Sequence, residues 1–144
     1  MSNFQFQHSY GRILGVAHTA LVRHLAKLMK AKNLPISPEQ FSVLSHLWQK
    51  DGRPQNELAI CTNRNRANVT RIIDILERDG IVERRDHAVD RRVFNIFLTE
   101  KGKALEKDTA ACAAQSIDDA LKGVSEEEKA IVMKVLRHSI DNLR

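Results

Sequence analysis

Arginines gather in two short stretches of this chain, and their density there is suited to binding a polyanion such as DNA. Residues 61–71 hold three arginines and no acidic residue: Arg64, Arg66 and Arg71. Residues 84–92 hold four arginines and two aspartates: Arg84, Arg85, Arg91, Arg92, Asp86 and Asp90. A guanidinium presents several N–H donors in one plane, which suits phosphate oxygens and guanine edges better than the point charge of lysine. On composition alone, two solvated surfaces without a ligand remain the alternative.

The first arginine stretch falls on a predicted helix-turn-helix. Residues 54–61 and 66–78 predict two short helices, joined by a turn at 62–65. Apolar side chains in the second helix recur at i, i+3, i+4 and i+7 and so form one buried stripe: Val69, Ile72, Ile73 and Leu76. Most of the polar side chains of this helix lie outside that stripe and are expected to face solvent. In such a motif the second helix enters the major groove of DNA.

The second arginine stretch falls on a predicted hairpin. Residues 81–85 and 93–98 predict two strands around a polar connector, and Phe94, Ile96 and Leu98 are expected on one side of the second strand. A hairpin directly after a helix-turn-helix predicts a wing that reaches the adjacent minor groove. Asp90 and Arg92 are two positions apart, so they project to the same side of an extended arm. We therefore expect Asp90 to orient Arg92 in that groove.

Long amphipathic helices are predicted on both sides of this core. The 144 residues suit one domain, with a core at about 37–100 flanked by helices over 8–32 and 103–144. Ser37 and Gln40 predict a capping box at the start of the helix before the core, and one long helix is expected over 100–122. The apolar faces of the flanking helices exceed what one chain of this length covers, so we expect an obligate homodimer. The expected fold class is mainly α with a small β-hairpin wing.

Residues 57–102 resemble the core of the MarR family of bacterial winged helix-turn-helix transcriptional regulators. The matching segments are Glu57-Leu58-Ala59, 69–74, 76–84 and 90–102. The family's wing pattern, Asp-x-Arg-x-x-x-Ile-x-Leu-Thr, is met at Asp90, Arg92, Ile96, Leu98 and Thr99. The chain departs from the family at Pro54, where a hydroxyl cap is frequent, and at Asn68, where Ser or Thr is frequent. Asn pairs well with adenine, so Asn68 is expected to alter which bases are read.

Pattern and resemblance together predict a sequence-specific DNA-binding regulator, a repressor that reads a pseudo-palindromic operator on double-stranded DNA as a homodimer. The expected DNA contacts are Arg64, Arg66, Ala67, Asn68, Thr70, Arg71, Arg84, Asp90, Arg91 and Arg92. The resemblance further implies release by a small aromatic or anionic ligand between the flanking helices and the core. Its expected lining residues are Tyr10, Arg12, Ile13, His46 and Trp48, although Ile13 and Trp48 as plain core residues remain the alternative.

Other functions find less support in the residues. No phosphate-binding loop or catalytic motif is present, so we expect no enzyme and no cofactor. His18 and His24 are six positions apart and do not share a helix face, so no metal site is expected. A redox-responsive regulator using Cys61 or Cys112, and a protein-interaction module that has lost DNA readout, remain alternatives. Cys61 is otherwise expected in the core. The first seven residues lack a secretory pattern and no stretch suits a membrane span, so the expected compartment is the cytoplasm.

Overall fold

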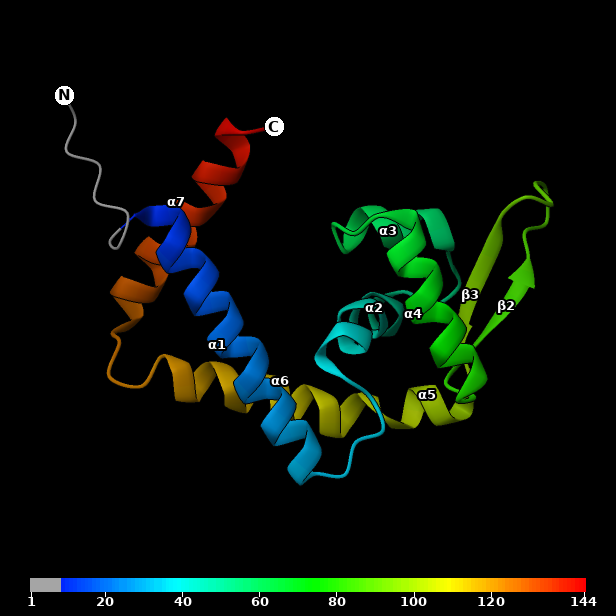
Figure 1. Cartoon of the computed structure of the whole chain (residues 1–144), viewed down its shortest axis with the longest axis horizontal. Coiled ribbons are helices and arrows are strands. Elements are labelled where there is room, and N and C mark those ends of the chain that lie inside the picture. The colour runs from blue at the N-terminus through cyan, green and yellow to red at the C-terminus, as the bar shows by residue number, and fades with distance from the viewer. Residues whose placement is uncertain (1–8) are drawn as a thin grey trace.

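The computed structural model describes residues 9–144, and the start of the first helix expected at His8 and the segment 1–7 lie outside them (Figure 1). Three of the helices begin at serine caps. Ser9 precedes α1 (Tyr10–Ala31), and Ser37 precedes α2 (Pro38–Gln49). Ser125 precedes α7 (Glu126–Asn142). At Ser37 and Ser125 the capping box is complete, because the cap backbone N–H donates to the side-chain oxygen of the residue three positions later, Gln40 or Glu128.

The predicted winged helix-turn-helix is confirmed. It consists of α3 (Gln55–Cys61), α4 (Arg66–Arg78), β2 (Val82–Asp86) and β3 (Phe94–Leu98). A third strand was not predicted: β1 (Arg53–Pro54) pairs antiparallel with β3, which gives the sheet order β1-β3-β2. Two residues are too few for an alternating pattern to be recognised in the sequence. Of the three β3 side chains expected on one side of the strand, Ile96 and Leu98 are buried, whereas Phe94, at the wing end of the strand, is exposed.

The single helix expected over 100–122 is wrong: the chain forms α5 (Glu100–Ala104) and α6 (Glu106–Ala120), interrupted at Leu105. α5 is held against the core, where Gly102 lies against the backbone carbonyl of Ile81 and accepts a hydrogen bond from Trp48 Nε1 at 3.0 Å. α6 instead packs along α1. At the break, the Leu105 backbone N–H donates to the Gly102 carbonyl at 3.4 Å, which closes a three-residue turn. No proline or glycine stands at Leu105 to indicate this break in the sequence.

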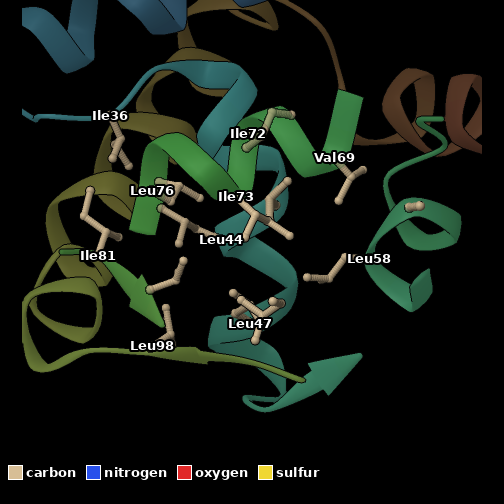
Figure 2. Packing of buried hydrophobic residues seen from close by; sticks show 14 of the residues in the cluster. Ile36, Leu44, Leu47, Leu58, Val69, Ile72, Ile73, Leu76, Ile81 and Leu98 are labelled. Carbon is tan, nitrogen blue, oxygen red and sulfur yellow. The ribbon is translucent and has the colours of Figure 1, made fainter. Parts of the chain in front are cut away.

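The core lies where α4 meets α2, α3 and the sheet, as Figure 2 shows. All four residues of the predicted α4 stripe are buried there. They meet buried side chains from α2, α3, the loop before β2, and β3: Leu44, Leu47, Leu58, Ile81 and Ile96. Burial of one such side chain contributes about 1.5–3 kcal/mol. This contact fixes the rotation of α4, and with it the face that remains in solvent.

The flanking helices leave much apolar surface uncovered within one chain. Only Leu25 and Met29 of α1 are buried, and α7 has no buried residue. Figure 1 shows α7 and the first turns of α1 extending together away from the winged helix. The exposed apolar side chains of these helices, with Leu143 directly after α7, are Tyr10, Ile13, Leu14, Val16, Val22, Ile131, Val132, Met133, Val135, Ile140 and Leu143. Apolar surface of this extent marks an interaction face.

Gly102 and Gly15 give a matched pair of substitutions. A Cβ at Gly102 would lie 2.2 Å from the Ile81 carbonyl oxygen, whereas a Cβ at Gly15 in α1 meets nothing within 4 Å. We expect Gly102→Ala to lower the free energy of unfolding by about 1–3 kcal/mol, and Gly15→Ala to leave it unchanged or to raise it by about 0.5–1 kcal/mol. Denaturant unfolding measures both. Equal effects of the two substitutions would contradict the close packing at Gly102.

Candidate nucleic-acid interface

The first turn of α4 presents polar side chains to solvent. Asn65 caps the helix, and its Oδ1 accepts a hydrogen bond from the backbone N–H of Asn68 at 2.8 Å. Arg66, Ala67 and Thr70 are exposed, and Asn68 is half-buried. The Thr70 hydroxyl donates to the Arg66 carbonyl at 2.9 Å and accepts from Gln55 Nε2 at 2.8 Å. The start of α4 is therefore fixed to α3, with Arg66 free to reach outward.

Arg71 lies one turn further along α4 and is paired. Its Nη2 makes an ion pair with Glu39 of α2 and lies 3.4 Å from the Asn68 side-chain oxygen. The Arg71 side chain is still 55% exposed. Glu39 was not among the expected site residues, because 32 positions separate it from Arg71 and nothing in the sequence connects the two.

The wing brings Asp90 and Arg92 together as expected. Arg92 Nε and Nη2 donate to the two carboxylate oxygens of Asp90 at 3.2 and 3.3 Å, and the Arg92 backbone N–H donates at 3.0 Å. These hydrogen bonds hold the pKa of the Asp90 carboxyl below its usual range. The Arg92 side chain is 90% exposed. His87 Nδ1 accepts the backbone N–H groups of Val89 and Asp90, which closes the tip.

The start of α4 and the wing border one hollow of about 630 Å³. Its lining residues are Gln55, Asn56, Arg66, Thr70, Asp90, Arg92, Val93 and Phe94. Arg66 lines it from the helix and Arg92 from the wing. The α3 end of α4 and the tip of the hairpin lie on the same side of the core (Figure 1). Two guanidinium groups so placed can engage a nucleic-acid backbone and the grooves on either side of it.

Arg84 occupies a different position from the one expected for a DNA contact. Its side chain is only 16% exposed and makes ion pairs with Asp74 at 2.6 Å and with Glu77 at 2.9 Å, both on α4. Its Nε donates to Gln55 Oε1 at 3.3 Å. The guanidinium is thus engaged by two carboxylates and an amide, and it ties the wing strand β2 to α3 and α4.

The two remaining expected DNA contacts differ in exposure. Arg64 is half-buried in the α3–α4 turn, after Asn63 with a left-handed φ of 53°. Its Nε is buried without a hydrogen-bond partner among the described residues. Arg91 is exposed on the wing and makes no ion pair within residues 9–144.

The five residues expected to line a ligand site are not brought together within this chain. Tyr10, Arg12 and Ile13 lie at the start of α1, where the Tyr10 hydroxyl donates to Ser139 of α7 at 2.9 Å. His46 and Trp48 lie on α2, far from that end of α1 (Figure 1). Trp48 is fixed to Gly102, and burial together with the nearby Arg53 guanidinium lowers the pKa of His46. A hollow of about 480 Å³ lies elsewhere, between α1 and α6 beside His24 and Asp119.

The cysteines occupy contrasting positions. Cys61 is exposed at the end of α3, so its expected place in the core is wrong: the buried face of that helix is taken by Leu58 and Ala59. Cys112 is buried on α6, where that helix packs on α1. Among residues 9–144 no group of three metal-binding side chains is found. No helix in the same range is long and apolar enough to cross a membrane.

This chain is similar in sequence and in fold to known transcriptional regulators. The family model described as MarR family matches residues 36–94. The HTH-type transcriptional repressor YetL of Bacillus subtilis is 34% identical over 110 residues, 75% of this chain and 66% of that protein, just under two thirds. The crystal structure of transcriptional regulator PA3341 is 32% identical with a TM-score of 0.80, over 94% of this chain and 98% of that one. The Staphylococcus aureus MepR–DNA complex, 24% identical with a TM-score of 0.84 over 93% and 98%, shows the fold alone.

Arg84 and Arg91 make a second matched pair. Arg84→Ala removes ion pairs that join β2 to α4, and we expect it to lower the free energy of unfolding by about 1–3 kcal/mol. Arg91→Ala removes an exposed charge from the same hairpin, and its effect is expected to stay within about 0.5 kcal/mol. Thermal or denaturant unfolding checks both variants. An Arg84→Ala protein as stable as the parent would leave the side chain without a structural role.

Proposed function

Because the chain belongs to the MarR family of transcriptional regulators, we propose that it represses transcription by reading a pseudo-palindromic operator as a homodimer. The observation that carries this proposal is the hollow shared by α4 and the wing, with Arg66 on one side and the exposed Arg92 on the other. A transcriptional regulator with this fold acts on DNA and not as an enzyme. Sequence-specific reading of DNA, assembly of the homodimer and repression of transcription are what we propose beyond that.

Readout in the major groove is assigned to the exposed start of α4. Arg66 and Arg71 reach guanine edges or phosphates, and Asn68 reaches adenine. Ala67 and Thr70 line the same surface and allow the helix to approach the bases closely. Arg64, in the turn before α4, is assigned to a phosphate.

Readout in the minor groove is assigned to Arg92. The bidentate contact with Asp90 restricts the side chain of Arg92 before DNA arrives, so less freedom is lost on entering a narrow groove of negative potential. Arg91 is assigned to phosphate or solvent on the other side of the hairpin. Arg84 is given no DNA contact here, because its donors are engaged by Asp74 and Glu77.

A second copy of the chain is the proposed occupant of the apolar faces of α1 and α7. An isologous dimer covers both at once, since the same faces are present on each copy. It also places two α4 helices on one DNA duplex, where half-sites one helical turn apart are about 34–36 Å from each other.

Release from DNA is assigned to a small aromatic or anionic ligand in the cytoplasm. A ligand works by binding one spacing of the two α4 helices more tightly than the other. Tyr10, Arg12 and Ile13 lie far from His46 and Trp48 within one chain. The expected ligand site can therefore form only where α1 of one copy meets α2 of the other across the dimer.

Redox control is supported better through the exposed Cys61 than through the buried Cys112.

The minor-groove assignment rests on one substitution. Arg92→Ala is expected to weaken operator binding at least tenfold at fixed salt and to leave the melting temperature nearly unchanged, because the side chain is exposed. The operator is first isolated by selection from genomic fragments, and affinity is then measured by fluorescence anisotropy. Arg78→Ala, at the opposite end of α4 from the tip of the wing, removes the same charge and is expected to change binding by less than twofold. Operator affinity within twofold of the parent would make the wing a structural hairpin only.

The dimer is tested by sedimentation. The parent is expected to sediment at micromolar concentration with twice the 16.4 kDa of one chain. Val135→Glu places a charge in the exposed apolar face of α7, and we expect it to weaken association at least tenfold. Lys134→Glu, at the adjacent exposed position, is the control and should sediment like the parent. A folded monomer from the parent would overturn the assembly.

A further inference from the structure

We propose that Glu39 sets the sequence specificity of α4 by holding Arg71 away from the DNA phosphates until a matching base edge is present. This inference rests on the DNA-binding function proposed above. It assigns a role to an acidic side chain of α2, a helix outside the helix-turn-helix itself.

The contact joins two helices at the surface expected to face DNA. Arg71 Nη2 is paired with Glu39 Oε1, and the same nitrogen lies 3.4 Å from the side-chain oxygen of Asn68. The Glu39 and Arg71 side chains are 38% and 55% exposed, so both remain within reach of an incoming duplex. Arg71 is therefore restrained by one carboxylate and one amide, and these two groups lie on different elements.

Glu39 is held on a rigid support. It lies in the first turn of α2, which the capping box of Ser37 and Gln40 fixes. The Ser42 hydroxyl donates to the Glu39 carbonyl at 2.6 Å, and Val43 and Leu44 of the same helix are fully buried in the core beneath α4. Pairing Glu39 with Arg71 therefore costs less conformational freedom than pairing two long side chains on mobile loops would.

The chemistry separates phosphate from base. Phosphate binding needs a free positive charge, but the Glu39 carboxylate already neutralises the Arg71 guanidinium and itself repels a phosphate. A guanine edge presents the neutral acceptors O6 and N7, and the guanidinium has donors left over for them after pairing with one carboxylate oxygen. The pair therefore weakens sequence-independent binding more than it weakens binding to a matching site.

The test is Glu39→Gln, measured against operator and unrelated duplexes over a series of salt concentrations. Freeing Arg71 for a phosphate should strengthen binding to unrelated DNA about fivefold or more, and steepen the slope of log affinity against log salt by about 0.9 for each protomer, or about 1.8 for the proposed dimer. Operator affinity should change by less than twofold, so the ratio of the two affinities falls. Glu126→Gln removes the same charge from α7, beside Lys129, and should leave ratio and slope unchanged.

A double substitution decides whether Glu39 acts through Arg71. Adding Glu39→Gln to an Arg71→Gln protein should change the slope and the ratio much less than adding it to the parent, because only the direct repulsion between the carboxylate and phosphate is then removed. Glu39→Asp keeps the negative charge and should retain the parent's salt slope. It serves as the second variant if the Glu39→Gln protein fails to fold. A steeper salt slope for Glu39→Asp would then overturn the inference.

Other results would also contradict this role. A Glu39→Gln protein that melts like the parent and keeps its ratio and slope overturns the inference, and so does an equal effect with and without Arg71. Both results leave operator binding by the parent intact, and with it the proposed function. A parent protein that prefers no DNA sequence overturns the proposed function and this inference together.

Discussion

The buried stripe of α4 is the contact on which the rest of the interface depends. Val69, Ile72, Ile73 and Leu76 lie on one face of the helix and are almost wholly removed from solvent, so their shared burial sets the rotation of the helix. The opposite face, with Arg66 and Thr70, is thereby turned to solvent. The orientation of the polar residues is a consequence of apolar burial, since their own hydrogen bonds to each other are too few and too exposed to hold a helix in place.

Polar contacts add to the apolar burial of Ile96 and Leu98 in placing the wing. Arg84 lies on β2 but is paired with carboxylates of α4 and with Gln55 of α3, and Gln55 in turn holds Thr70. Polar contacts thus join the hairpin to the very turn of α4 that carries Arg66. A shift of the hairpin is resisted at the place where α4 and the wing share a hollow, and this keeps the distance between Arg66 and Arg92 defined.

The winged helix could be predicted because its signals are local. The α4 stripe, the capping box of Ser37 and Gln40, and the pairing of Asp90 with Arg92 all depend on residues within one or two turns of each other. The break at Leu105 could not be predicted, because it follows from Gly102 packing against Ile81, which is 21 positions earlier in the chain. The same holds for Arg84 and for Glu39, whose partners are brought close only by the fold. Charge counted along the chain cannot distinguish an arginine already engaged by acids from one free to bind.

The outer edge of the sheet has a further consequence. β1 is an edge strand of two residues, and one of them is Pro54, which has no backbone N–H to offer a neighbouring strand. β3, which carries the apolar side chains of the sheet, is shielded on that side by a strand too short to act as a template. Edge strands of this kind do not recruit strands from other molecules. On its β1 side the sheet is thereby protected against pairing with a strand of another molecule.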